Sequence, residues 1–225
     1  MNRLTDIFSG NKKALIVFDC AGAPDMAVSA QRIEEIIRSG ADIIELGIPF
    51  SDPMADGAAI QEAYQTALQN GADLSKILAM IKTLRTAHPE VGFIVSGYCN
   101  IFLQYNYDKL FAELAALEID ALRILDLPCE EYAEIAPYSE KYNVKIVISV
   151  SKTTTPERLE KMLALPGSII YCDNATTAAT VKAQTSLPIA LNLDNSFDAV
   201  IVDNAAVKTP CGKLGTLIKE YKNKL

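Results

Sequence analysis

The sequence predicts one α/β domain in the form of a (β/α)8 barrel, or TIM barrel, with shortened crossovers between the sixth and seventh and between the seventh and eighth strands. Short hydrophobic runs alternate with helical stretches, which is typical of a parallel sheet with helical crossovers. Eight such runs are present, the strand number of this barrel. The 225 residues, half of them hydrophobic, suit one large core, so we expect residues 1–225 to form a single domain.

The first half of the chain contains four strand signals. Near-continuous apolar runs indicate parallel strands that are covered on both faces. Gly40 is typical of a helix end and Asp73 of a helix start. The expected strands are 14–19, 43–46, 93–98 and 121–127, and the expected helices are 26–39, 58–70, 74–87 and 107–117.

The second half continues the alternation but becomes shorter toward the end. The expected helices are 130–141 and 155–163, and the expected strands are 144–150, 168–172, 187–191 and 198–202. Residues 176–185 are small and polar, which fits a short helix or a mobile loop. Only residues 192–197 separate the last two strands, whereas a parallel crossover needs roughly a dozen residues. Either a tight irregular loop joins these strands or one of them lies outside the barrel.

Composition excludes several classes of function. The net charge is −7, with 21 basic and 28 acidic residues and no basic cluster, so nucleic acid and anionic membranes are unexpected partners. Five cysteines without CxxC spacing indicate reduced thiols in a cytoplasmic protein. No segment approaches the ~18 apolar residues of a membrane span. His88 is the only histidine, so we expect neither a histidine base nor a histidine-ligated metal.

Residues 41–57, ADIIELGIPFSDPMADG, have the pattern of a catalytic strand end. Glu45 lies in a buried apolar run, where loss of hydration disfavours the charged form of a carboxylate. Glycines and prolines shape the following loop, which displays Asp56. Two acids in such different surroundings can divide acid and base roles. The structural alternative is that Glu45 is satisfied by a neighbouring arginine or a backbone amide, and that Asp52 and Asp56 serve as turn and cap residues.

The segment ELGIPFSDPMADG, residues 45–57, resembles the signature of the tryptophan synthase α subunit family. The resemblance extends over about residues 3–172. It implies a lyase of tryptophan biosynthesis that cleaves indole-3-glycerol phosphate to indole and glyceraldehyde 3-phosphate without a cofactor. It also implies that Glu45 is the acid/base that protonates indole C3, and that Asp56 binds the indole N–H and stabilises positive charge there.

The resemblance also implies a substrate pocket and a partner. The expected pocket residues are Phe18, Tyr98, Tyr171 and Asp126, gathered at the carboxyl ends of strands. The expected contact with a pyridoxal-phosphate-dependent β subunit is formed by Asp52, Pro53 and Pro128. Each aromatic residue could instead be an ordinary core residue, and each of the other three a simple turn residue.

The last quarter of the chain departs from the family pattern. The family binds the substrate phosphate through glycine loops, whose backbone N–H groups can approach the anion closely. Here the equivalent positions are Asn192, Asp194, Asp203 and Asn204, which predict a degraded phosphate site. Either the two acids face the phosphate position and repel it, or they cap turns and point to water.

Arg123 is a second departure, since it interrupts the apolar run at 121–127. If it points inward, Glu45 or Asp56 should be its partner, because a buried arginine needs a carboxylate. If it points outward, its charged end should reach solvent beneath a helix.

Two functions from different classes therefore remain open. The first is a lyase of the family type, and the second is a catalytically impaired barrel that acts by binding and activating a β subunit. Retention of both acids favours the first, whereas loss of the glycine loops favours the second. An enzyme that binds a divalent metal through Asp194 and Asp203 is a third alternative, although two acids supply few of the ligands that such a metal needs.

Overall fold

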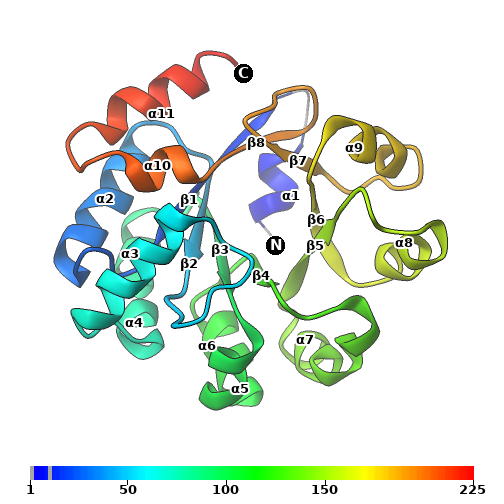
Figure 1. The fold of residues 1–225 in the computed structure, drawn as a ribbon, viewed down its shortest axis with the longest axis horizontal. Helices are drawn as coiled ribbons and strands as arrows, with labels where there is room; N and C mark the ends of the chain where they lie inside the picture. Colours follow the sequence, from blue (N-terminus) through cyan, green and yellow to red (C-terminus); the bar gives the residue numbers. More distant parts are fainter. Residues whose placement is uncertain (1–2, 10–11) are drawn as a thin grey trace.

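The protein forms a closed barrel of parallel strands in the order β1 to β8 (Figure 1). The computed structural model describes residues 3–9 and 12–225. Within these residues the strands are β1 Ala14–Cys20, β2 Ile43–Gly47, β3 Gly92–Gly97, β4 Ala121–Ile124, β5 Lys145–Val150, β6 Gly167–Cys172, β7 Ile189–Asn192 and β8 Ala199–Val202. This arrangement confirms the predicted barrel.

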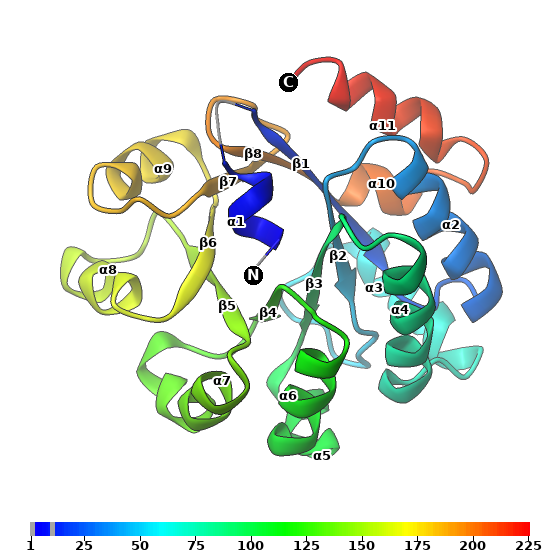
Figure 2. The same cartoon turned by 180° about the vertical axis from the view of Figure 1, so that it is seen from behind.

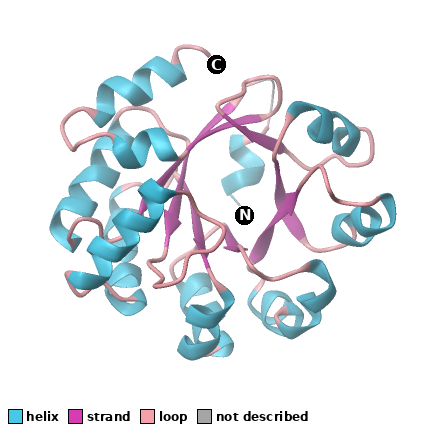
Figure 3. Ribbon diagram, in the orientation of Figure 1, coloured by secondary structure: helices cyan, strands magenta, loops and turns pink. Residues whose placement is uncertain are grey.

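The helices surround the strands as an outer ring (Figure 3). They are α1 Arg3–Ile7, α2 Met26–Arg38, α3 Ala58–Gln69, α4 Leu74–Ala87, α5 Cys99–Tyr105, α6 Tyr107–Ala116, α7 Ala136–Tyr142, α8 Pro156–Leu163, α9 Ala175–Lys182, α10 Asn204–Lys208 and α11 Leu214–Lys222, with the 3-10 helix η1 at Cys129–Glu134. None of the helices in the described part of the chain is long and apolar enough to span a bilayer.

Helix α1 is the exception to the outer ring, because it lies across one opening of the barrel (Figure 2). Its Leu4 is buried among the inward-facing residues of the strands, such as Ile16, Ile43 and Ile94. Side chains alternate between the two faces of a strand, so the residues between these face the outer helices. The barrel interior is therefore a packed core that α1 closes at its amino end.

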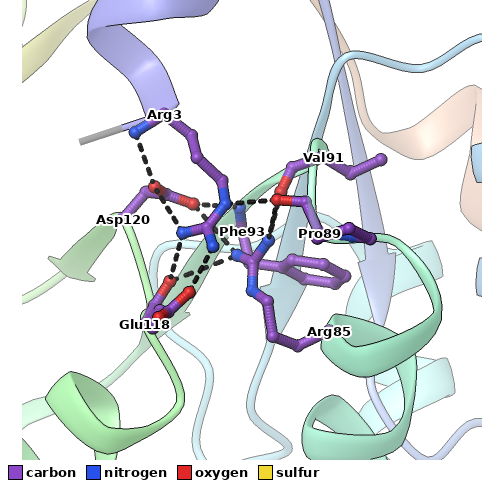
Figure 4. Close-up of polar contacts among 7 residues, drawn as sticks. All are labelled: Arg3, Arg85, Pro89, Val91, Phe93, Glu118 and Asp120. Atoms are coloured by element: carbon purple, nitrogen blue, oxygen red, sulfur yellow. Dashed lines mark hydrogen bonds and ion pairs between the residues drawn. The ribbon is translucent and has the colours of Figure 1, made fainter. Parts of the chain in front are cut away.

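A polar cluster anchors this closed end (Figure 4). Arg85 from α4 donates to Asp120 at 3.1 Å, and the backbone N–H of Phe93 donates to the same oxygen at 2.8 Å. The backbone N–H of Arg3 donates to the other oxygen at 3.2 Å, and the Arg3 side chain pairs with Glu118. Asp120 thus ties α1, α4 and β3 together.

The last crossover is a loop without a helix. Strands β7 and β8 pair in parallel from Ala190 with Ala199 to Asn192 with Ile201, and residues 193–198 join them. The alternative of a tight irregular loop is therefore correct, and both strands belong to the barrel. Phe197 of this loop packs against the outer core. The preceding crossover keeps the short helix α9.

Some boundaries differ from the sequence expectation. Strand β4 ends at Ile124, three residues before the end of the predicted strand at 127. The predicted helix 130–141 divides into η1 and α7, because Pro137 lacks a backbone N–H and favours the first turn of a new helix. Helices α1, α5, α10 and α11 were not predicted.

Candidate active site

A cavity of about 280 Å³ opens at the carboxyl ends of the strands. Its walls come from most of the barrel and from the loop that follows β2. It is lined by Phe18, Glu45, Asp56, Ile60, Arg123, Leu125, Ser149, Val150, Ser151, Tyr171, Cys172, Asp173, Asn192, Ile201 and Asp203. The carboxyl end is the end at which barrels of this class carry their chemistry.

Glu45 lies at the floor of this cavity. It shares the inward face of β2 with Ile43, and its neighbours in the ladder are Phe18 on β1 and Ile94 on β3. The side chain is only 1% exposed. One carboxylate oxygen, Oε1, accepts a hydrogen bond from Arg123, and the Tyr171 hydroxyl is a further hydrogen-bonding neighbour of the carboxylate. Glu45 is therefore a buried acid that lines the cavity.

Arg123 points inward, so the first of the two alternatives for this residue is correct. Its Nη1 lies 3.0 Å from Glu45 Oε1 and its Nε donates to Ser149 Oγ at 3.3 Å. The guanidinium lies 4.6 Å above the centre of the Tyr171 ring. Burial lowers the pKa of Arg123 most strongly, but the charge and hydrogen bond of Glu45, together with Tyr171 and Asp56, outweigh burial, and the pKa lies above its ordinary value.

Asp56 reaches the cavity from the loop between β2 and α3. Its Oδ2 accepts a hydrogen bond of 2.6 Å from the Tyr98 hydroxyl, which itself accepts from the backbone N–H of Ala55 at 3.0 Å. Burial raises the pKa of Asp56 above its usual range, while the hydrogen bond from Tyr98 and the charge of Arg123 oppose the rise. Tyr98 therefore fixes both the loop and the carboxylate.

The aromatic residues predicted for the pocket take different positions. Phe18 and Tyr171 line the cavity, and the buried Tyr171 hydroxyl lies beside the Glu45 carboxylate. Tyr98 acts through Asp56 instead of lining the cavity. Asp126 lines a neighbouring cavity of about 390 Å³, where it accepts a hydrogen bond from the Cys99 N–H at 2.7 Å.

Gly47 explains part of the motif that follows Glu45. A Cβ atom at this position would lie 2.3 Å from the Tyr64 hydroxyl and 2.5 Å from the Phe18 ring. Two real atoms do not approach this closely, so only glycine allows Tyr64 and Phe18 to pack beneath the cavity.

The four polar residues of the predicted degraded phosphate site separate into two groups. Asn192 and Asp203 line the cavity, and Asn192 Nδ2 donates to Asp203 at 2.7 Å. Asp203 also accepts from the backbone N–H of Asn204, the first residue of α10. Asp194 lies in the β7–β8 loop, where it is not among the cavity residues and accepts from the Ser196 N–H at 2.8 Å. Asp194 and Asp203 therefore do not converge on a common metal position.

The proposed partner residues lie on loops at the same end of the barrel. Asp52 and Pro128 are exposed and Pro53 is half-buried. Met54 beside them is 79% exposed. This exposed methionine was not predicted, although its place within the signature offered a signal.

Several other cavity residues were also not predicted. Ser149 shares the inward face of β5 with Val147, so strand alternation starting from the core could have placed it in the cavity. Asp173 directly follows β6, where parallel strands deliver functional side chains. Ile60 comes from α3, and its position depends on helix packing that the sequence does not fix.

Comparison with known proteins places this site in a family. A family model described as "Tryptophan synthase alpha chain" matches residues 4–199. The tryptophan synthase alpha chain of Chloroflexus aggregans is 33% identical over 91% of this chain and 84% of its own length. That of Petrotoga mobilis is 31% identical over 99% of this chain and 96% of its own length.

Solved structures agree with these relatives. Tryptophan synthase subunit alpha from Legionella pneumophila superposes with a TM-score of 0.92 at 27% identity, covering 99% of this chain and 98% of the other. A chain of Mycobacterium tuberculosis tryptophan synthase superposes with a TM-score of 0.93 at 27% identity, covering 99% and 97%. The family match, the sequence relatives and the shared barrel lead to one conclusion: the chain belongs to the tryptophan synthase alpha chain family.

Proposed function

We propose that the protein is a lyase that cleaves indole-3-glycerol phosphate to indole and glyceraldehyde 3-phosphate in tryptophan biosynthesis. Membership of the alpha chain family supports the proposed reaction. The placement of Glu45 and Asp56 on one cavity supports these two acids as the catalytic residues. The single observation that carries the proposal is that the buried Glu45 carboxylate and Asp56 line the same cavity.

The proposed chemistry divides between these two acids. Protonated Glu45 gives its proton to indole C3, and Asp56 accepts a hydrogen bond from the indole N–H and stabilises the positive charge that develops there. Glu45 then takes the proton of the hydroxyl on the adjoining side-chain carbon. The bond between that carbon and C3 breaks, its electron pair returns to the indole ring, and the carbon becomes the aldehyde of the second product.

The proposal is tested by measuring indole release. Glu45→Gln removes the group that carries the proton, so we expect a loss of at least about a hundredfold in kcat, the lower range of general acid–base catalysis. Asp56→Asn should lower kcat in the same way. Asp194→Asn is the matched control, because this acid lies in a loop away from the cavity. Equal indole release by the Glu45→Gln variant would remove Glu45 from the mechanism.

A second function is supported by the rim of the barrel. We propose that the surface formed by Asp52, Pro53, Met54 and Pro128 binds a β subunit of tryptophan synthase. The 79% exposure of Met54 supports this surface, since an exposed methionine is common at binding sites. If the barrel acts only through this surface, indole release will be absent for the isolated chain, while added β subunit will gain activity.

The proposed location is the cytoplasm. All five cysteines of the chain are free thiols, which supports a reducing compartment.

A further inference from the structure

Arg32 on α2 forms a buried ion pair that the chemistry proposed above does not use. Its Nε and Nη2 donate to the two carboxylate oxygens of Asp19, each at 2.9 Å. The side chain of Arg32 is 8% exposed and that of Asp19 is 2% exposed. Asp19 follows Phe18 on β1, and because side chains alternate along a strand, it points away from the cavity that Phe18 lines. The ion pair therefore lies behind the cavity wall.

Two further hydrogen bonds join Arg32 to the end of α10. Nη1 donates to the carbonyl oxygen of Thr209 at 2.7 Å, and Nη2 donates to that of Ala206 at 3.0 Å. The last carbonyl groups of a helix lack partners inside the helix, and a cation beside them stabilises the helix. Asp19 fixes the guanidinium through two parallel bonds, a geometry that lysine cannot form. Arg32 is thus a fixed cap on α10.

Helix α10 depends on such contacts because it has only five residues. A helix this short does not form on its own in water, so the rest of the protein must hold it. It packs against β1 and α3 (Figure 1). Inside it, the backbone N–H of Val207 donates to the carbonyl oxygen of Asp203 at 3.1 Å. This bond connects the capped end of the helix to its start.

The start of α10 belongs to the cavity wall. Asp203 immediately precedes the helix and lines the cavity, where one carboxylate oxygen accepts a hydrogen bond of 2.7 Å from Asn192. The other oxygen accepts from the backbone N–H of Asn204. Barrels of this class frequently bind phosphate at the loops that follow the seventh and eighth strands. Asp203 therefore holds a negative charge at the place where the phosphate end of a substrate is expected.

We propose that Arg32 is a positioning residue, which is fixed by Asp19 and holds α10 so that Asp203 stays beside the phosphate end of the substrate. Arg32 thereby sets how strongly the cavity repels a phosphate group, although it lies outside the cavity. The inference rests on the lyase proposed above and specifies how its site treats the anionic end of that substrate.

The test measures phosphate binding by isothermal titration in variants of both residues. Arg32→Lys keeps the charge beside Asp19 but cannot bind the carboxylate and both carbonyl groups together. Because α10 is then released, Asp203 leaves its fixed place, and the dissociation constant of inorganic phosphate should fall by at least about threefold. In the Asp203→Asn background, where no charge remains to be displaced, Arg32→Lys should leave this constant unchanged.

Arg85→Lys is the matched control. Arg85 is also a buried arginine that joins a carboxylate, that of Asp120, to backbone carbonyl groups, those of Val91 at 2.6 Å and Glu118 at 3.2 Å, but at the amino end of the barrel (Figure 4). Its substitution should lower the melting temperature about as much as Arg32→Lys does. It should leave phosphate binding as in the unmodified protein, so the comparison separates positioning from general stability.

Two further measurements follow α10 and the reaction. The backbone N–H of Val207 should exchange with solvent at least about threefold faster in Arg32→Lys than in Arg85→Lys, because the helix opens more often without its cap. In assays of indole release, Arg32→Lys should lower KM for indole-3-glycerol phosphate more than it changes kcat. The reason is that the hydrogen bonds of Arg32 end on Asp19 and on α10, away from both catalytic acids.

An unchanged phosphate dissociation constant in Arg32→Lys would overturn the inference, and so would unchanged exchange at Val207. An equal fall in the dissociation constant with and without the Asp203 carboxylate would also overturn it, since the effect would then not pass through Asp203. If the unmodified protein releases no indole, the proposed lyase fails, whereas phosphate titration and hydrogen exchange still decide the role of Arg32.

Discussion

At the scale of single residues, Tyr98 controls the second acid of the site. Its hydroxyl donates to Asp56 at 2.6 Å, and this bond opposes the rise that burial causes in the pKa of Asp56. The ring also stacks on Phe50, with 5.1 Å between the ring centres. The hydroxyl and the ring therefore have separate roles, which substitution can distinguish.

We expect Tyr98→Phe to move the rising limb of kcat/KM to higher pH. The phenylalanine keeps the stack on Phe50 but removes the hydrogen bond, so the pKa of Asp56 rises further and the ionised form that binds the indole N–H appears at higher pH. The pH profile of indole release measures this shift. Tyr105→Phe is the control, because it removes a 2.9 Å bond to Glu113 elsewhere on the molecule. An unchanged rising limb would show that Asp56 ionisation does not depend on Tyr98.

Asp203 is expected to weaken phosphate binding. It lies in the cavity, and at roughly 6 Å from a phosphate each pair of charges would repel by about 3 kcal/mol at an effective dielectric constant of 20. This corresponds to about two decades in affinity. Asp203→Asn should therefore lower the dissociation constant of inorganic phosphate and of glyceraldehyde 3-phosphate by about that factor.

Isothermal titration measures this change, with Asp194→Asn as the matched control. The control should bind phosphate as the unmodified protein does, because Asp194 accepts its hydrogen bond from Ser196 in the loop outside the cavity. Micromolar binding by the unmodified protein would show that Asp203 does not repel the phosphate.

Residue-level predictability depended on strand alternation. The inward position of Arg123 follows from Ala121 two residues earlier, which faces the barrel core. The sequence does not predict that Arg123 pairs with Glu45 and not with Asp56, because the pairing depends on how β2, β4 and the loop after β2 lie relative to one another. Likewise, Asp194 and Asp203 have the same side chain, and only the path of the β7–β8 loop separates them.

At the scale of elements, the β7–β8 connection shows how a barrel can close without one of its helices. Both strands are four residues long, so the returning chain has a short distance to cover. The outward residues Leu191 and Val200 are buried nonetheless, at 2% and 3% exposure. Phe197 packs against this core from within the loop.

We expect Phe197→Ala to destabilise the protein by about 2 kcal/mol, as for the loss of a partly buried aromatic side chain. Chemical denaturation with urea measures the change in the free energy of unfolding. Leu193→Ala, from the same loop, should have little effect, because Leu193 is 54% exposed. Equal losses in both variants would mean that Phe197 does not replace the missing helix.

The elements that the sequence failed to predict are mostly short. Helices α1, α5 and α10 have five, seven and five residues, too few for a clear helical period. Helix α11 has nine residues and packs against α2. This contact joins segments that lie far apart in the sequence, so hydrophobic periodicity does not reveal it. Longer elements, such as β1 and α4, have a hydrophobic pattern long enough to be predicted from the sequence.

At the scale of the whole molecule, the barrel has a functional end and a stabilising end. The carboxyl ends of the strands carry Glu45, Asp56 and Arg123, whereas the amino ends are closed by α1 and the cluster around Asp120. The alternation of strands and helices was enough to predict the barrel, because eight parallel strands with helical crossovers close in this way. The cluster could not be predicted, since its members are far apart in the sequence.

Asp120→Ala provides a test of this division. Asp120 is 4% exposed and is bound by Arg85, itself 7% exposed, and by the backbone of Phe93. Removing the carboxylate leaves a buried arginine without its counter-ion, which typically costs about 3 to 5 kcal/mol. We expect a loss of this size in one cooperative transition, as for a single domain. Below the melting temperature, kcat for indole release should remain close to that of the unmodified protein, because the cluster lies at the opposite end from the cavity.

Denaturation curves and kinetic assays on the same preparation separate the two effects. Glu118→Ala is the control, because its carboxylate is 63% exposed and its pairing with Arg3 should contribute less than about 1 kcal/mol. A second unfolding transition in the Asp120→Ala variant would contradict the single-domain prediction. A fall in kcat with unchanged stability would instead mean that the amino end of the barrel communicates with the site.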